Sequence, residues 1–215
     1  MNLMNGKSNS KSDPPLFHSD QILSNYDSGG LISSFLDLVL EFNKKVNIVS
    51  RETSLEGLRR IAADCLVPLE LGFDIKGRFF DIGSGGGFPG IMMMLAKPHT
   101  EGVLIERTGK KAEFLQFVID KFHLKGKVFP DNFVEIALKL EKDSFDFGLM
   151  KYVKMEQKLF NCALSLLKIN GKFLHYSGIG PTGTAEMKDF KSDEVRYYLD
   201  DIKQIRGLTI ISKIV

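Results

Sequence analysis

The stretch Phe79-Phe-Asp-Ile-Gly-Ser-Gly-Gly-Gly-Phe-Pro-Gly90 is the strongest indicator of the fold of this 215-residue chain. It starts with apolar residues, changes to glycine at Gly83 and continues into an apolar run over residues 91–96. This order predicts a strand, a tight turn and the start of a helix. Glycines suit such a turn because they lack the Cβ that would hinder a sharp bend and the close approach of a ligand. Free N–H groups at the start of the helix add hydrogen-bond donors, so the stretch predicts a nucleotide-type cofactor site.

Strands and helices are expected to alternate after this turn. The predicted strands are 77–83, 101–106, 127–131, 145–150 and 171–176, and the predicted helices are 88–96, 109–123, 133–141 and 153–168. Alternation with short loops favours an α/β fold, with a doubly wound, mostly parallel, Rossmann-like sheet and helices on both faces. Two β-rich runs, 194–199 and 208–213, predict an antiparallel C-terminal hairpin around a turn at the sheet edge, for a seven-stranded sheet.

The chain before the sheet is expected to form a tail and a helical extension. Residues 1–18 are polar and contain two adjacent prolines, so we predict a disordered tail that stays out of the core. Residues 19–75 show apolar positions at three- and four-residue steps, which is typical of amphipathic helices. We expect them to form a helical cap that packs as one compact unit on a domain of residues 76–215.

Composition narrows the possible classes of protein. The net charge of +2, from 29 basic and 27 acidic residues, neither requires nor excludes nucleic acid, because binding needs only a local basic face. The two cysteines, Cys65 and Cys162, form no metal-type pair, so we expect reduced thiols, no metal and a cytoplasmic location. The first residues lack the apolar core of a signal peptide, and no apolar run is long enough to span a membrane. We expect a monomer.

An acidic residue at the end of the second predicted strand supplies a partner for a ribose. In a doubly wound sheet, ligands bind beyond the carboxyl ends of the strands, where Gly83 and Glu106 both lie. A carboxylate at this place can accept hydrogen bonds from two ribose hydroxyls. The arrangement is common to sites for NAD and for S-adenosyl-L-methionine, and it leaves both cofactors open.

Phe88 and Pro89 favour S-adenosyl-L-methionine over a dinucleotide. The dinucleotide fingerprint has a glycine at the position of Phe88, where it permits close approach to a pyrophosphate. A bulky aromatic at the mouth of the site suits a ligand without a pyrophosphate, and Pro89 suits the first turn of a helix. The antiparallel hairpin also fits the sheet of a methyltransferase.

Several motifs resemble those of the glucose-inhibited division protein B (GidB, RsmG-like) family, bacterial methyltransferases of small-subunit ribosomal RNA. The matching stretches, spread over residues 30–213, are Phe42-Asn-Lys-Lys-Val-Asn-Ile48, the glycine-rich stretch, Glu106-x-x-x-Lys110-Lys-Ala-x-Phe-Leu115, Phe145-Asp146, Leu166-Leu-Lys-x-x-Gly171 and Arg206-Gly-Leu-x-Ile-Ile-x-Lys213. The resemblance implies an S-adenosyl-L-methionine-dependent enzyme. Its substrate would be N7 of a guanine in 16S ribosomal RNA, within the small ribosomal subunit.

The resemblance also implies which residues hold the cofactor and the RNA. Glu106 would bind the ribose, and Val134 and Glu135 would lie near the adenine. Lys151 stands where the family has an arginine near cofactor and RNA, and Tyr152 stands where it has an alanine. The expected cofactor-binding residues are Asp81, Gly83, Ser84, Gly85, Phe88, Glu106, Val134, Glu135 and Lys151. The expected RNA-binding residues are Arg60, Lys110, Lys111 and Lys151.

Two features of the expected RNA surface have alternative interpretations. Lys110 and Lys111 lie in the first turn of a predicted helix, where the helix dipole disfavours cations. This mildly unfavourable placement suggests an anionic partner, although two solvated surface lysines would look the same. Tyr176, near the end of a predicted strand, is either a base-stacking residue or a strand aromatic that packs inside.

No catalytic residue in the sense of a general base is expected. Guanine N7 already carries an in-plane lone pair, so catalysis would consist of holding it in line with the methyl–sulfur bond. Departures from the pattern that the resemblance implies include Ile61, Phe133, Lys151 and Ser177. They leave open a drifted paralogue that binds cofactor or RNA with little or no activity. A methyltransferase of a different substrate and a nicotinamide enzyme are further alternatives.

Overall fold

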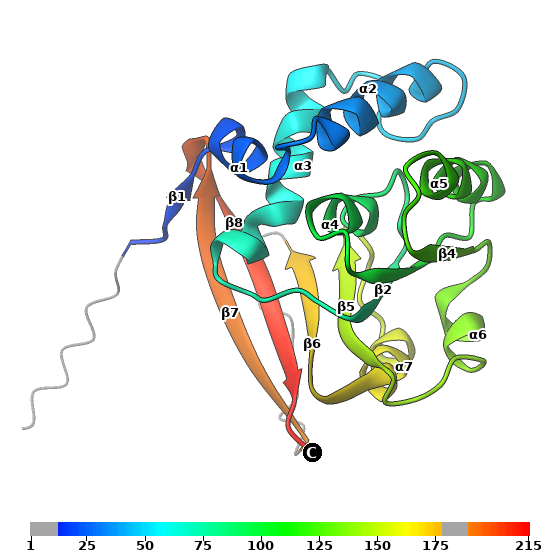
Figure 1. Cartoon of the computed structure of the whole chain (residues 1–215). Helices are drawn as coiled ribbons and strands as arrows, with labels where there is room; N and C mark the ends of the chain where they lie inside the picture. The colour runs from blue at the N-terminus through cyan, green and yellow to red at the C-terminus, as the bar shows by residue number, and fades with distance from the viewer. Residues whose placement is uncertain (1–12, 178–188) are drawn as a thin grey trace, which may run out of the picture.

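The computed structural model describes residues 13–177 and 189–215 (Figure 1). The elements in chain order are β1 (Leu16–Phe17), α1 (Ser19–Tyr26), α2 (Leu31–Asn43), α3 (Leu55–Glu70), β2 (Arg78–Ile82), α4 (Gly90–Ala96), β3 (Glu101–Ile105), α5 (Gly109–Lys121), β4 (Gly126–Phe129), α6 (Phe133–Ala137), β5 (Phe145–Lys151), α7 (Gln157–Leu166), β6 (Leu167–Ser177), β7 (Phe190–Leu199) and β8 (Asp201–Lys213). No helix of the described residues is both long and apolar enough to cross a membrane.

The strands form one sheet in the order β1-β7-β8-β6-β5-β2-β3-β4. The strands from β2 to β6 pair in parallel, whereas β8 runs antiparallel to both β6 and β7. The strand order reverses at β2, because β3 lies on one side of it and β5 on the other. The predicted doubly wound, mostly parallel fold with a C-terminal antiparallel hairpin is confirmed. In doubly wound sheets a ligand binds where the strand order reverses, so the carboxyl end of β2 is the candidate site.

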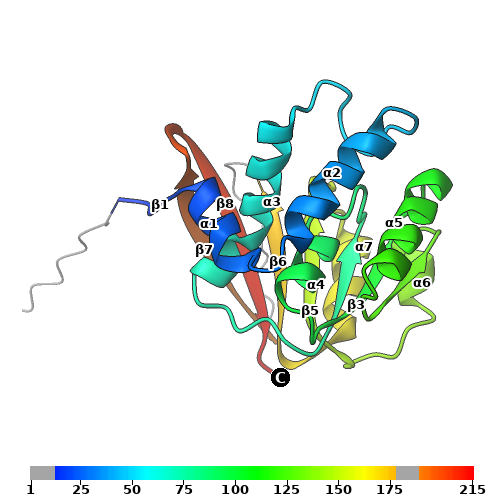
Figure 2. The ribbon, with the colours of Figure 1, turned by 45° about the horizontal axis from the view of Figure 1, so that its top comes forward.

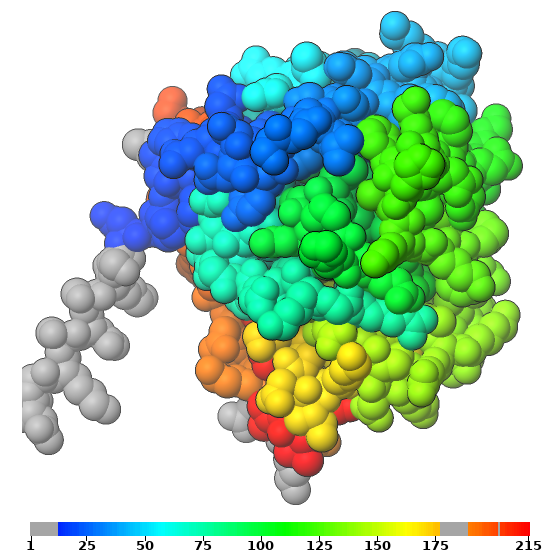
Figure 3. Space-filling model, in the orientation of Figure 1, coloured from blue at the N-terminus to red at the C-terminus, as the bar shows by residue number. Residues whose placement is uncertain are grey.

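The helices cover both faces of the sheet, because successive strand residues face opposite sides. Phe79 packs in one hydrophobic cluster, with side chains of α1 to α5, and Phe80 packs in the other, with side chains of α6 and α7. The cap helices therefore share a core with the sheet. Figure 2 shows α2 and α3 above α4 and the sheet, and Figure 3 shows the surface of α1 to α3 continuous with that of α4 and α5.

The predicted disordered tail is wrong for the residues just before α1. Leu16 and Phe17 form β1, a two-residue edge strand that pairs in parallel with β7 and makes an eighth strand. The ring of Phe17 packs edge-on against that of Tyr197, with 6.0 Å between centroids. Asp200 in turn accepts hydrogen bonds from the N–H (2.7 Å) and hydroxyl (2.5 Å) of Ser19. Residues 1–12 lie outside the described residues.

The C-terminal hairpin is longer than the two short runs that were predicted. β7 and β8 pair almost to their ends, and the chain reverses at Asp200, which has a φ of 58°. Residues 200–207, expected as a turn, therefore belong almost entirely to β8. This lengthening brings Tyr197, which is 1% exposed, and Arg206 to the side of α3.

Candidate active site

The glycine-rich loop forms the predicted tight turn at the carboxyl end of β2. Gly83, Gly85 and Gly87 have φ values of 68°, 54° and 93°, in the left-handed region that favours glycine. The N–H groups of Gly83 and Ser84 both donate to the carbonyl of Ile105, at 2.9 and 3.1 Å, which ties the loop to the end of β3. A Cβ on Gly83 would lie 2.6 Å from a methyl group of Val153, so the loop leaves no room for a side chain there.

Glu106 holds this loop from the neighbouring strand. One carboxylate oxygen accepts from the N–H of Gly85 at 2.9 Å, and the other accepts from the N–H of Thr108 at 2.8 Å. The residue is 7% exposed. Because each carboxylate oxygen can accept two hydrogen bonds, each keeps one lone pair for a ligand. This geometry fits the expected role of Glu106 as the partner of a ribose. Glu106 also holds the backbone of Gly85, which the sequence did not indicate.

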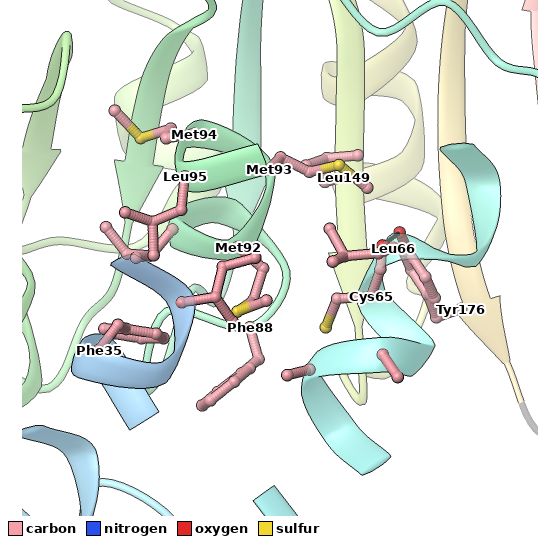
Figure 4. Packing of buried hydrophobic residues seen from close by; sticks show 14 of the residues in the cluster. Phe35, Cys65, Leu66, Phe88, Met92, Met93, Met94, Leu95, Leu149 and Tyr176 are labelled. Carbon is pink, nitrogen blue, oxygen red and sulfur yellow. Dashed lines mark hydrogen bonds between the residues drawn. The ribbon is translucent and has the colours of Figure 1, made fainter. Parts of the chain in front are cut away.

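The side chains of Asp81, Ser84 and Phe88 lie behind the loop, inside the protein. Asp81 and Ser84 are fully buried, and an oxygen of Asp81 accepts from the N–H of Gly90 at 3.0 Å. Phe88 is 8% exposed and packs against Phe35 of α2, with 5.5 Å between ring centroids. Figure 4 shows both rings in the cluster around α4. The expected position of Phe88 at the mouth of the site is wrong, since α2 covers it, and these three side chains support the loop from below.

The buried carboxyl of Asp81 makes the stability of the protein depend on pH. Burial raises the pKa of Asp81 from its ordinary value of 3.8 to about 7. Between these values the folded protein binds more protons than the unfolded chain, so this group lowers stability as the pH rises. Asp81→Asn keeps an oxygen for the N–H of Gly90 but cannot ionise. The free energy of unfolding of this variant, taken relative to that of the wild type, should therefore be higher at pH 8 than at pH 5. Urea unfolding at both pH values checks this, and a difference that does not change with pH would contradict it.

Val134 and Glu135 lie at the start of α6, at the same sheet edge as Glu106. Asn132 caps this helix by accepting from the N–H of Val134 at 2.9 Å. Val134 is half-buried and Glu135 is exposed, so both remain available to a ligand beside β4. Phe133, where the resemblance led us to expect an arginine, is buried and stacks on Phe80 at 5.7 Å between centroids. This position therefore contributes to the core and provides no charge at the site.

Lys151 is not the exposed RNA contact that was expected. It lies at the end of β5, is 4% exposed and forms a buried ion pair with Asp64 of α3. Burial lowers the pKa of Lys151, but Cys65 and Asp64 beside it raise that pKa by more, so the ammonium stays charged. The Arg206 guanidinium lies 3.3 Å from the Asp64 carboxylate, and the Tyr197 hydroxyl donates a hydrogen bond to the same carboxylate at 2.9 Å.

This buried cluster lines a small pocket of about 110 Å³ between α3, the ends of β5 and β6, and the hairpin. The lining residues are Asp64, Lys151, Tyr152, Tyr176, Tyr197, Gln204, Ile205, Arg206 and Gly207. Sequence reasoning missed Asp64, Tyr197 and Arg206 as residues of the site. One signal was present: Asp64 is a lone acid within an otherwise apolar stretch of helix, Ala62-Ala63-Asp64-Cys65-Leu66. A buried acid of this kind requires a partner.

Lys110 and Lys111 follow Glu106 closely, in the first turn of α5. Lys110 is exposed and Lys111 is half-buried. Arg60 is exposed on α3 and is engaged with two carboxylates, Glu56 at 2.6 Å and Asp200 at 3.6 Å. The two lysines therefore offer their charge at the carboxyl edge of the sheet, whereas that of Arg60 is partly neutralised.

Tyr176 packs inside the protein, which is the second of the two alternatives that the sequence left open. It is 4% exposed, and its hydroxyl donates to the carbonyl of Cys65 at 2.7 Å. Figure 4 shows it facing Cys65 and Leu66 of α3. Among the described residues, no group of three or more His, Cys, Asp or Glu side chains could hold a metal ion.

Comparisons with known proteins agree on one family. The family model described as rRNA small subunit methyltransferase G matches residues 30–203. A ribosomal RNA small subunit methyltransferase G of Syntrophomonas wolfei is 34% identical over 149 residues, which cover 68% of this chain and 69% of the relative.

Solved structures show a common fold at low sequence identity. A candidate O-methyltransferase of Klebsiella pneumoniae has a TM-score of 0.64 at 12% identity, covering 92% of this chain and 96% of its own. A mutant of MtNAS in complex with S-adenosylmethionine has a TM-score of 0.57 at 15% identity, covering 92% of this chain and 83% of its own. At these identities the likeness concerns the fold alone.

Proposed function

Since the chain belongs to the rRNA small subunit methyltransferase G (GidB) family, we propose that it methylates N7 of a guanine in the 16S RNA of the small ribosomal subunit, with S-adenosylmethionine as the donor. One observation within the site carries this proposal. The Glu106 carboxylate lies beside the glycine-rich loop, is fixed by Gly85 and Thr108, and keeps lone pairs free. Methylation of ribosomal RNA would take place in the cytoplasm.

The residues present fit S-adenosylmethionine. Glu106 would accept from the two ribose hydroxyls, the backbone of Gly83 and Gly85 would border the cofactor, and Val134 and Glu135 would lie near its adenine. Asp81, Ser84 and Phe88 would act indirectly, because their buried side chains hold the loop. The cofactor supplies an electrophilic methyl group on a sulfonium. Residues 19–75 would form a cap on the domain of residues 76–215 and would supply Asp64 to the site.

The protein's part in the reaction would be to position the base. Guanine N7 presents a lone pair without losing a proton, so no side chain has to act as a general base. The cluster of Lys151, Asp64 and Arg206 would fix the end of β5 relative to the hairpin. A preorganised arrangement of this kind keeps the reacting atoms in line at near-attack distance. Lys110 and Lys111 would contact RNA phosphates at the same edge.

Methyl transfer to purified ribosomal subunits tests this proposal. We expect labelled methyl from S-adenosylmethionine to enter small subunits that come from cells lacking this protein, and to map to one N7-methylguanine. Large subunits and the Glu106→Ala variant are the negative controls. If the protein binds S-adenosylmethionine in calorimetry but labels no ribosomal RNA, it is the drifted paralogue or acts on a different substrate. If it binds NAD and not S-adenosylmethionine, the proposal is wrong.

A further inference from the structure

Tyr152 has a conformation and an exposure that the contacts described so far do not explain. Its φ is 58°, a left-handed conformation that is strained for a bulky side chain, and it is 74% exposed. It lies directly after β5, in a loop that replaces the start of the helix predicted from residue 153. The next residue, Val153, contacts the glycine-rich loop at Gly83. The backbone thus holds an aromatic ring in water beside the candidate cofactor site.

The surroundings of the Tyr152 ring are aromatic and cationic. The Lys151 ammonium lies 4.7 Å from the centroid of the Tyr152 ring and 4.7 Å from that of Tyr176. Tyr176 is enclosed on the inner side of the ammonium, whereas Tyr152 forms the outer wall of the pocket. One face of the Tyr152 ring therefore meets the cation, and its exposure leaves room for a flat ligand. A planar base can stack on such a ring.

The pocket behind the ring has an excess of hydrogen-bond donors. It contains two cations, Lys151 and Arg206, and one carboxylate, Asp64. Asp64 already receives the Lys151 ammonium, the Arg206 guanidinium and the Tyr197 hydroxyl. The buried Nε of Arg206 has no hydrogen-bond partner within the part of the chain that the structure describes. An exposed ring in front of such a pocket suits a nucleotide, since the base would meet the ring and a phosphate would meet the cations.

We propose that Tyr152 is the stacking platform for the target guanine, an unpaired purine of RNA drawn out of its own stack. This inference rests on the proposed function and adds a substrate-binding residue to it. A base on Tyr152 would lie next to the loop at Gly83, on the side from which a methyl group would be transferred.

A tryptophan at position 152 reports stacking directly, because the protein has no tryptophan of its own. We expect the fluorescence of Tyr152→Trp to be quenched saturably by a single-stranded RNA oligonucleotide that contains one guanine. The same oligonucleotide with an abasic site in place of the guanine should not quench it. Phe117→Trp, a control at a 42% exposed aromatic on α5, should respond to neither. Equal quenching by both oligonucleotides, or none while fluorescence anisotropy shows the RNA bound, would overturn the proposal.

A kinetic comparison separates the ring from its hydroxyl. Tyr152→Asn removes the ring but tolerates a positive φ, and it should lower kcat/KM for small subunits by about 5- to 150-fold. Its affinity for S-adenosylmethionine should stay within twofold of wild type, and Tyr152→Phe should recover most of the rate. A Tyr152→Phe variant as slow as Tyr152→Asn would show that the hydroxyl acts, and it would overturn stacking. If fluorescence anisotropy shows that the wild type binds no RNA, the proposed function is wrong, and the stacking proposal that rests on it is wrong too.

Discussion

Replacing Glu106 by alanine is expected to weaken the binding of S-adenosylmethionine by at least about 100-fold. Hydrogen bonds to a charged group contribute about 1.5–3 kcal/mol each, and the ribose would lose two of them. The loss has a second part, because Gly85 would no longer be held by a carboxylate oxygen at 2.9 Å. The loop would then bind the cofactor with a less ordered backbone. Isothermal titration calorimetry with the purified variant measures the change in Kd.

Two further variants separate the ribose contact from loss of the fold. Glu113→Ala removes an exposed carboxylate of α5 and should leave the Kd unchanged. Glu106→Gln keeps an oxygen for Gly85 but loses the charge, so its affinity should fall between those of wild type and alanine. Circular dichroism should give all three the spectrum of the wild type. An unchanged Kd in a folded Glu106→Ala variant would mean that the ribose does not bind at this carboxylate.

Replacing Lys151 by methionine is expected to lower the free energy of unfolding by about 3–5 kcal/mol, which is the usual cost of removing one partner of a buried ion pair. The variant leaves the carboxylate of Asp64, 3% exposed, without its ammonium. Arg206 at 3.3 Å still offers partial compensation, so the lower end of this range is expected. Equilibrium unfolding in urea gives the value.

A double variant tests whether the pair itself is the cause. Asp64→Asn together with Lys151→Met removes both charges, while the introduced amide oxygen can still accept from the Tyr197 hydroxyl. We expect this protein to be more stable than the Lys151→Met single variant. Lys191→Ala, which breaks an exposed pair with Asp193, should change stability by less than about 0.5 kcal/mol. Equal loss in the double and single variants would mean that packing, and not the unpaired charge, accounts for the effect.

The fold was predictable because its signals are local. The alternation of apolar runs and helical periodicities in residues 77–176 gave the strands and helices in the right order, and some ends differed by several residues. The start of α7 was predicted too early, because the segment that carries Tyr152 has apolar residues without being helical. The two-residue strand β1 was missed because its pairing with β7 depends on contacts far along the chain.

The glycine-rich turn after β2 and the carboxylate of Glu106 beside it could be predicted from the amino-acid sequence alone. A positive φ favours glycine, and parallel strands bring their carboxyl ends to one edge, so both features follow from local rules. The positions of Lys151 and Phe88 depend instead on contacts between distant parts of the chain. Asp64 lies 87 residues from Lys151 and 133 from Tyr197, and packing of α3 against β5 and the hairpin brings them together. Burial at that junction turned an expected RNA contact into an internal ion pair and left Tyr152 as the residue that faces the solvent.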